Sequence, residues 1–357
     1  METIAKEYGL KVNKQKSNII IFNMENKPEN IGGISVGDRI KYLGIIVNDK
    51  RNCFQMQKEE MFRKARRLAN MTYNVIEKSC SRMFIGKTYW KNVALPSILY
   101  GVNIINITKT DIKKLQRIEN GVYRKILRAP MYAQEAVLRG EIGSSSVKNR
   151  IREGQWKYLR YVLVEGNDLV RRVGEEMIEK RQSRWVKDLL NELRATEGLS
   201  VSVRNETKES IKQRMREVDT REWKRQMNEK ASLKIYRKWR QELGGQEEVY
   251  TNNQASEVLF RCRTNNMQLK DRNRHRQEET KCDMCEAENE DLRHFLLWCP
   301  AYAEERAKCV RLQQPYEEEE DDTIGKILFE NEHTEQTKTT VHKFWTIREK
   351  RMKEKGK

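Results

Sequence analysis

Short apolar runs open the chain, and apolar residues at helical spacing replace them further on. Residues 18–22 read Asn-Ile-Ile-Ile-Phe, and residues 40–47 place β-branched residues around a Tyr-Leu-Gly turn. We therefore expect a buried strand followed by a second strand pair or hairpin. A helix-like start ends at Gly9, which can cap it. These strands are too few to make a domain alone, so residues 1–50 are interpreted as a small β part of a larger fold.

Residues 51–150 have the spacing of helices. Thr110 is the predicted N-cap of one helix, because an apolar stripe at helical spacing follows it. That stripe predicts a face turned to the core and consists of Ile112, Leu115, Ile118, Val122 and Ile126. The remaining faces are basic, and they either face solvent or contact a phosphate backbone. Their cations are Lys113, Lys114, Arg117, Arg124, Lys125 and Arg128.

The rest of the chain also reads as mainly helical. Residues 151–279 form a predicted helical linker region with a break at Gly244-Gly245, and a basic cluster of Arg272, Arg274 and Arg276 closes it. Residues 311–357 begin with the acidic run 317–322, a predicted solvated loop, and end in a predicted helix. The expected fold is thus mainly α with a small β remnant.

Residues 280–310 contain the most specific chemical signal. Cys282, Cys285, His294 and Cys299 follow the spacing Cys-x2-Cys-x8-His-x4-Cys, a ligand set that suits tetrahedral Zn²⁺. Four protein ligands leave no position for a catalytic water, so the zinc would be structural. Residues 291–299 read as a short helix before Pro300. The alternative is a set of unrelated buried thiols.

Two further cysteines are rival ligands. Cys262 lies twenty residues before the first of the four ligands, and Cys309 lies ten residues after the last, so both rank below them. Phe295 and Trp298 lie between the last two ligands and form either a small core behind the zinc or stacking surfaces for unpaired bases. With so little else to fold on, the segment would owe most of its folding free energy to the metal.

Charge adds a candidate partner. The net charge is +18, and residues 51–150 hold 20 Lys and Arg against 7 Asp and Glu, whereas residues 251–357 hold 20 against 22. A positive block of this kind indicates RNA or DNA as partner, with a merely soluble basic surface as the alternative. No apolar run approaches the ~20 residues of a membrane span. Seven cysteines, three of them in the candidate zinc site, favour a reducing intracellular compartment, nuclear or cytoplasmic.

Two short motifs carry a resemblance to a known family. Gly9-Leu10-Lys11-Val12-Asn13, with Lys16-Ser17, is followed about thirty residues later by Tyr42-Leu43-Gly44. This order resembles the end of a reverse transcriptase palm of the non-LTR (LINE-type) retrotransposon family. The resemblance implies a primer grip at Tyr42, Leu43 and Gly44, a thumb in residues 51–150 and a zinc knuckle in residues 280–310. It also implies an RNA-directed DNA polymerase that works with two Mg²⁺ ions, with Lys16 as a possible general acid or else an ordinary surface lysine.

The catalytic signature of that family is missing from this sequence. The aromatic-x-Asp-Asp motif is absent, and the one adjacent Asp pair, Asp321-Asp322, belongs to the acidic run. The chain would thus correspond to the part that follows the catalytic hairpin, with an upstream polymerase half as partner and Mg²⁺ only in the intact polymerase. We expect no polymerase activity from this chain alone. The alternative is a stand-alone, non-enzymatic zinc-knuckle protein that binds nucleic acid; a nuclease is disfavoured because no Pro-Asp…Asp/Glu-x-Lys pattern follows the knuckle.

Overall fold

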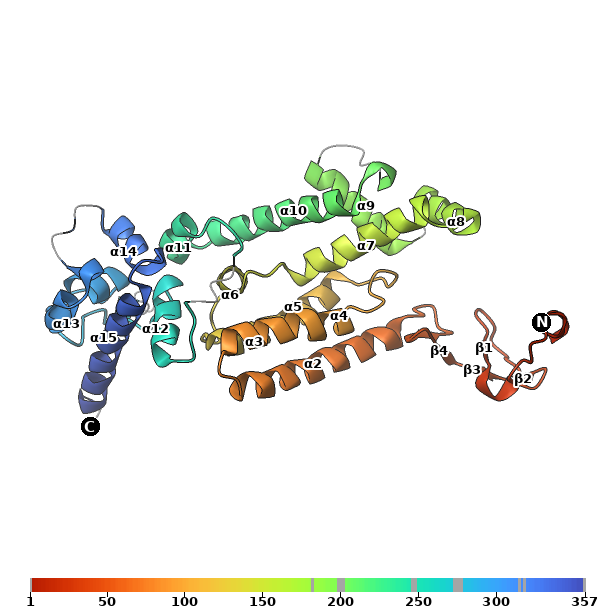
Figure 1. Cartoon of the computed structure of the whole chain (residues 1–357), viewed down its shortest axis with the longest axis horizontal. Helices are drawn as coiled ribbons and strands as arrows, with labels where there is room; N and C mark the ends of the chain where they lie inside the picture. The colour runs from red at the N-terminus through yellow and green to blue at the C-terminus, as the bar shows by residue number, and fades with distance from the viewer. Residues whose placement is uncertain are drawn as a thin grey trace.

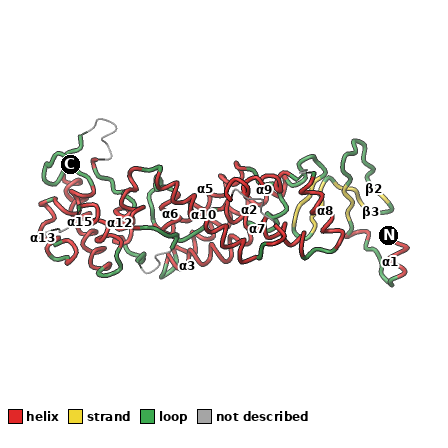
Figure 2. Tube along the Cα trace, turned by 90° about the horizontal axis from the view of Figure 1, so that it is seen from above, coloured by secondary structure: helices red, strands yellow, loops and turns green. Residues whose placement is uncertain are grey.

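The computed structural model describes residues 2–180, 183–197, 203–244, 249–271, 279–313, 316 and 319–355. It is an elongated, mainly helical molecule with its few strands at the N-terminal end and the cysteine–histidine segment in the lobe at the other end (Figures 1 and 2). The prediction of a mainly α fold with a small β part is confirmed. The predicted basic cluster Arg272, Arg274 and Arg276 lies outside the described residues.

The β part follows α1 (Glu2–Glu7) and the short turn η1 (Lys14–Lys16). Strands β1 (Asn18–Ile20), β2 (Asn30–Ile31) and β3 (Ile34–Gly37) form one sheet in the order β1-β3-β2, with β1 parallel and β2 antiparallel to β3. Strands β4 (Arg39–Tyr42) and β5 (Ile45–Asn48) form the predicted hairpin. Its two turn residues, Leu43 and Gly44, both have positive φ, as tight hairpin turns require.

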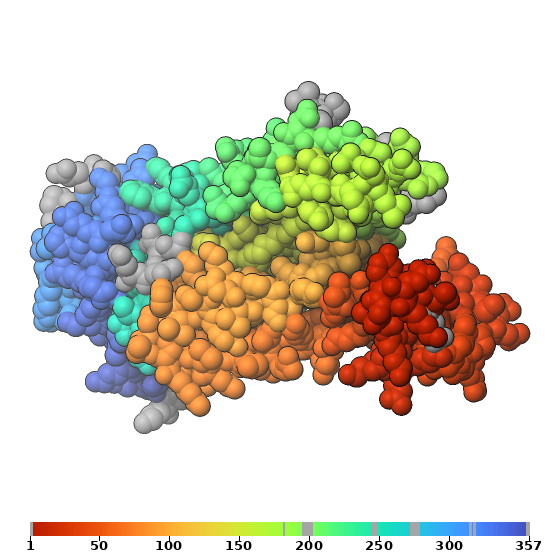
Figure 3. All heavy atoms as spheres, turned by 45° about the vertical axis from the view of Figure 1, so that its right-hand side comes forward, coloured from red at the N-terminus to blue at the C-terminus, as the bar shows by residue number. Residues whose placement is uncertain are grey.

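This N-terminal segment has no core of its own. Asn48 is the single buried residue among the described side chains up to residue 50, and Phe22 is 47% exposed. The prediction of a buried strand at residues 18–22 is therefore wrong in two respects: the strand ends at Ile20, and its isoleucines are only half-buried. In Figure 3 the segment, in red, lies at one end of the molecule against the helices drawn in orange.

The central helices start with α2 (Gln55–Glu77). The chain then returns along it through α3 (Arg82–Tyr89), the π-turn η2 (Trp90–Ala94) and α4 (Leu95–Ile98), and runs out again in α5 (Lys109–Leu127). Consequently α2 and α5 are parallel neighbours. The Nζ of Lys58 lies 3.1 Å from a carboxylate oxygen of Asp111, and further along both helices Lys125 lies over the ring of Tyr73.

The predicted apolar stripe of α5 is confirmed, but its predicted cap is wrong. Leu115, Val122 and Ile126 are buried, while Ile112 and Ile118 are half-buried against the same core. The N-cap is Thr108 rather than Thr110: its hydroxyl accepts from the backbone N–H of Asp111, whose carboxylate in turn accepts from the N–H of Thr108. This reciprocal pair satisfies two N–H groups at once, which an N-cap at Thr110, two residues on, could not reproduce.

A second helical layer covers one side of this body. It comprises α6 (Glu135–Ile142), α7 (Val147–Val164), α8 (Asp168–Glu179), α9 (Arg184–Glu197), η3 (Val203–Asn205) and α10 (Lys208–Asn228). Trp156 and Trp185 anchor a small core of their own between α7, α9 and α10. Trp223 instead joins the main core, where its indole N–H donates to the carbonyl of Ala136 at 2.8 Å.

The C-terminal lobe, residues 249–355, is reached through η4 (Ala231–Leu233) and α11 (Lys234–Trp239). It contains α12 (Gln254–Arg263), η6 (His294–Trp298), η7 (Pro300–Tyr302), α13 (Ala303–Ala307), η8 (Val310–Leu312), α14 (Glu320–Phe329) and α15 (Thr334–Lys355). Glu320 to Asp322 of the predicted acidic loop form the first turn of α14, where negative charge complements the helix dipole. That part of the loop prediction is wrong.

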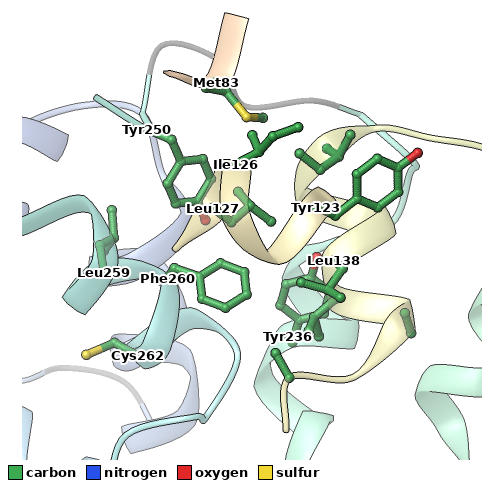
Figure 4. Packing of buried hydrophobic residues seen from close by; sticks show 14 of the residues in the cluster. Met83, Tyr123, Ile126, Leu127, Leu138, Tyr236, Tyr250, Leu259, Phe260 and Cys262 are labelled. Atoms are coloured by element: carbon green, nitrogen blue, oxygen red, sulfur yellow. The ribbon is translucent and has the colours of Figure 1, made fainter. Parts of the chain in front are cut away.

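One continuous core joins this lobe to the central helices. Figure 4 shows Ile126 and Leu127 of α5 packed beside Tyr250 and Phe260 at the start of the lobe. A buried carboxylate, Glu141, holds the same junction by accepting from Tyr250 and from other buried donors around it. The lobe and the central helices are therefore packed as one body.

Candidate metal centre and basic surface

The four predicted ligands lie together. The ligand atoms of Cys282, Cys285, His294 and Cys299 are all within 4.8 Å of one another. The Cys285 Sγ is 3.2 Å from the His294 Nε2, and the Cys282 Sγ is 4.0 Å from the Cys299 Sγ. Zinc bonds of about 2.0 Å to nitrogen and 2.3 Å to sulfur hold tetrahedral ligands roughly 3.5–3.8 Å apart. The cluster can therefore hold a metal ion, and its donor set is the one that zinc prefers.

Local backbone geometry brings these ligands together. The N–H of Glu286 donates to the Cys282 carbonyl at 2.9 Å, and the N–H of Cys282 donates to the Ala287 carbonyl at 2.8 Å, which closes a turn around the first two cysteines. The predicted short helix is present but wound as a π-turn, in which the N–H of Cys299 donates to the His294 carbonyl at 2.8 Å. A five-residue step spans about one turn of such a helix, so both side chains lie on one face.

The electrostatics of the cluster favour a thiolate. The hydrogen bond from the Cys299 thiol lowers the pKa of Cys282 to about 3, and the same contact raises the pKa of Cys299. The contact between the two sulfurs thus favours the ionised form of Cys282 and the protonated form of Cys299. Since thiolate is the form that binds zinc, this pair would release its remaining proton when metal binds.

A buried ion pair stands directly behind the ligands. Arg348 of α15 donates two hydrogen bonds, of 2.7 and 2.6 Å, to the carboxylate of Glu290, and the two side chains are 7% and 1% exposed. One oxygen of Glu290 is 3.9 Å from the Cys282 Sγ, and the other accepts from the backbone N–H of Lys270. The C-terminal helix is therefore bonded to the residue that supports a candidate metal ligand.

The core behind the ligands is larger than the sequence suggested. Phe295 is buried, and its ring packs edge-on against Tyr302, Phe344 and Trp345, with centroids 5.3–6.4 Å apart. The expectation that the segment has only a small apolar cluster to fold on is wrong, because α15 supplies most of the partners. Phe295 is a core residue and unavailable for stacking on bases.

The remaining aromatic and the two rival cysteines are also placed. Trp298 is 45% exposed, its N–H donates to Glu320 at 2.9 Å, and Tyr316 packs against it edge-on. Cys262 and Cys309 are buried elsewhere and do not belong to the ligand cluster. Burial raises the pKa of the Cys262 thiol, so it stays protonated.

The predicted basic residues of α5 separate into two groups. Arg124 is half-buried and donates to the Ala133 carbonyl, and Arg128 forms the C-cap of the helix and an ion pair with Glu257. Both have structural contacts. The other predicted cations, Lys113, Lys114, Arg117 and Lys125, are exposed.

Two of these exposed cations lie over aromatic rings of the neighbouring helix α2. Lys114 lies over the ring of Phe62 at 5.5 Å, and Lys125 lies over Tyr73 at 5.8 Å. Arg66, which we had not singled out, lies between the two rings on the same side of α2, four residues after Phe62, and it is exposed. We call this set the basic seam; it consists of Arg66, Lys113, Lys114, Arg117 and Lys125.

The residues of the primer-grip motif form the tip of the β4–β5 hairpin. Tyr42 and Leu43 are 67% and 71% exposed, and the Leu43 carbonyl accepts from the hydroxyl of Tyr100 at 2.8 Å. Gly44 lies close to the same tyrosine ring: a Cβ built at this position would be 3.3 Å from the ring. The hairpin is thus docked on the end of α4. Lys16 is exposed in η1.

Comparison with known proteins identifies no relative. No protein-family model matches the chain, and neither a curated protein nor a solved structure matches it. Function is therefore argued from the residues and their geometry. Among the described helices, none is both long enough and apolar enough to cross a membrane.

Proposed function

We propose that this chain binds RNA or DNA through the basic seam, with a structural zinc ion stabilising the C-terminal lobe. We propose further that it is the C-terminal part of an RNA-directed DNA polymerase of the non-LTR retrotransposon type. In that setting it supplies contacts to template and primer, and carboxylates outside this sequence hold the Mg²⁺ ions. The observation that carries the binding proposal is the set of exposed cations on the neighbouring helices α2 and α5.

The seam has the length and the charge that a phosphate backbone needs. Lys114 and Lys125 are eleven residues apart on one helix, which is about 16 Å at 1.5 Å per residue. That distance covers roughly five steps of a DNA strand at 3.4 Å each. The acidic residues of α5 do not cancel it, because Asp111 is paired with Lys58 and Glu119 is buried against Arg150.

Aromatic rings beneath the lysines help to position the charges. Phe62 and Tyr73 are half-buried under the two ammonium groups, so each cation keeps a favourable contact while its remaining donors face outward. A preformed row of cations loses less conformational freedom on binding than free surface lysines do.

The motif order and the exposed hairpin support the polymerase proposal. Tyr42, Leu43 and Gly44 occupy the tip of a hairpin beside the start of α2, the position that a grip on a primer next to the seam requires. The N-terminal segment also exposes Tyr8, Leu10 and Leu43, all above 60%. An upstream polymerase half would cover such side chains. Within it, Lys16 would be available as a general acid toward the leaving pyrophosphate.

Trp298 favours the second candidate, a nucleic-acid-binding protein that acts without a polymerase. Its half-exposed indole beside the zinc ligands offers a surface on which an unpaired base can stack. The two candidates share the basic seam, and they differ in whether an aromatic-x-Asp-Asp frame precedes this sequence in its gene.

The test is a salt titration of binding to duplex and single-stranded probes. Replacing four seam cations with glutamine should reduce the slope of log K against log salt by about 3.6 on duplex DNA, because each phosphate contact contributes about 0.9. The variant carries Lys113→Gln, Lys114→Gln, Arg117→Gln and Lys125→Gln.

A matched control removes the same charge from the other helical layer, where the side chains are equally exposed. It should keep the wild-type slope. An unchanged slope in the seam variant, or an equal reduction in both variants, would refute the proposal. The control carries Arg172→Gln, Arg184→Gln, Lys187→Gln and Lys224→Gln.

A further inference from the structure

A second group of cations lies in a cleft away from the basic seam. The cleft has a volume of about 610 Å³ and is lined by α3 and η2, by the loop between α6 and α7, and by α7 and α10. Five basic side chains line it: Lys87, Lys91, Arg150, Lys212 and Arg216. They come from positions far apart in the sequence, and the fold brings them to one hollow.

The acidic residues of the cleft are largely occupied by other partners. Asp219 is paired with the buried guanidinium of Arg139 at 2.8 Å and also accepts from the hydroxyl of Ser146. Glu153 is paired with Lys157 at 2.5 Å. Glu242 therefore remains as the single counter-charge among the described residues that line the cleft.

Three of the five cations are exposed and unpaired. Within the described part of the chain, no carboxylate forms an ion pair with Lys91, Lys212 or Arg216. Arg150, by contrast, is fixed at the back of the cleft by Glu119 at 2.6 Å and by the hydroxyl of Tyr123. The cleft thus combines one immobile guanidinium with three free cations at its rim.

The remaining lining suits the rest of a phosphorylated molecule. Apolar side chains of Leu95, Ile142 and Leu243 form one part of the wall, and the hydroxyl-bearing residues Ser145 and Thr220 form another. Ligand-binding clefts measure roughly 300–1,000 Å³ and combine apolar walls with a few converging polar groups. A phosphate group at the rim with an organic body against the apolar wall fits this arrangement.

We propose that this cleft binds a phosphate-bearing ligand, either a free nucleotide or the phosphorylated end of a nucleic acid strand. The two sources share the phosphate chemistry that converging lysine and arginine side chains recognise. The site is separate from the basic seam on α2 and α5, so it stands whether or not the seam binds nucleic acid.

Calorimetric titration of the full chain with pyrophosphate tests the site directly. The wild type should bind, and the variant with Lys91→Ala, Lys212→Ala and Arg216→Ala should bind at least about tenfold more weakly, since each lost charge-assisted hydrogen bond alone accounts for that factor. These side chains are exposed, so their truncation leaves the core intact.

A seam variant with Lys114→Ala, Arg117→Ala and Lys125→Ala is the control and should keep the wild-type affinity for pyrophosphate. Failure of the wild type to bind, or equal weakening in both variants, would overturn the proposal. If only the seam variant loses duplex binding, that result supports the proposal for the seam and does not bear on the proposal for the cleft.

Two further probes distinguish the sources of phosphate. Tighter binding of a 5′-phosphorylated oligothymidylate than of its unphosphorylated form, lost in the cleft variant, identifies a strand end. Tight binding of ATP, also lost in the cleft variant, with no effect of the 5′-phosphate on the oligonucleotide, identifies a free nucleotide. If the cleft variant binds both ATP and the oligonucleotides with the wild-type affinity, the proposal is overturned.

Discussion

The ion pair between Arg348 and Glu290 allows a sharp test of how the metal-binding segment is held. Replacing Arg348 with methionine keeps an unbranched apolar stem but removes the guanidinium. The Glu290 carboxylate, 1% exposed, then keeps the backbone N–H of Lys270 as a donor and faces the Cys282 sulfur at 3.9 Å. An unpaired carboxylate is thus left in the core of the C-terminal lobe.

The expected cost is large because the pair is fully buried. Removing one partner of a buried ion pair destabilises a protein by about 3–5 kcal/mol, whereas removing both charges together is often nearly neutral. Arg348→Met should therefore lose that amount. Adding Glu290→Gln should recover at least about 2 kcal/mol, since the amide oxygen can still accept from Lys270 and no charge remains unpaired.

The assay is urea unfolding combined with hydrogen exchange of the α15 amides. Lys343→Met is the matched control: it lies on the same helix and removes an ion pair to Glu305 at 2.9 Å, but its side chain is 52% exposed. Exposed pairs contribute little, so it should behave as wild type. Two results would contradict this expectation: Arg348→Met as stable as Lys343→Met, or a double variant as unstable as Arg348→Met.

Three further outcomes are expected. Metal analysis should find one zinc per chain, lost in Cys285→Ser and retained in Cys309→Ser, because only the former belongs to the ligand cluster. Gly325→Ala should destabilise the protein by several kcal/mol in urea unfolding, since its Cβ would lie 1.8 Å from the Trp239 Nε1. Gly244→Ala is the control, because a Cβ at that position has no atom within 4 Å. Primer extension on a homopolymer template with Mg²⁺ or Mn²⁺ should show no activity above a heat-inactivated sample, and extension would contradict the interpretation of the missing Asp-Asp motif.

Local spacing explains what the sequence predicted correctly. The four ligands lie within eighteen residues, so a turn and one helical turn suffice to bring them together. The apolar stripe of α5 likewise depends on one helix. The cap of that helix could have been predicted from the same stretch, because Thr108 has Asp111 three residues later whereas Thr110 has Lys113.

Contacts between distant segments explain what the sequence did not show. Glu290 and Arg348 are 58 residues apart, and neither has a neighbour in sequence that marks it as buried. The cations of the cleft come from α3, η2, α7 and α10, and Arg66 belongs to the seam only because α2 runs parallel to α5. Burial of the first strand was overestimated because a β-branched run is compatible with burial but does not supply a covering layer.

The contacts between the metal-binding segment and α15 change the expected effect of removing the metal ion. A zinc knuckle that folds only around its ion would unfold alone on chelation and leave the helices unchanged. Here Phe295 shares its core with α15, and α15 is bonded to Glu290 behind the Cys282 sulfur. The same lobe meets the central helices at Asn252, whose side chain accepts from the backbone N–H of Arg82 at 2.9 Å and donates to the Ser79 carbonyl at 2.8 Å. The ion would therefore stabilise α15 and its aromatic core as well as its own turn. Its removal should destabilise the whole C-terminal lobe more than the helices α2 and α5 that carry the basic seam.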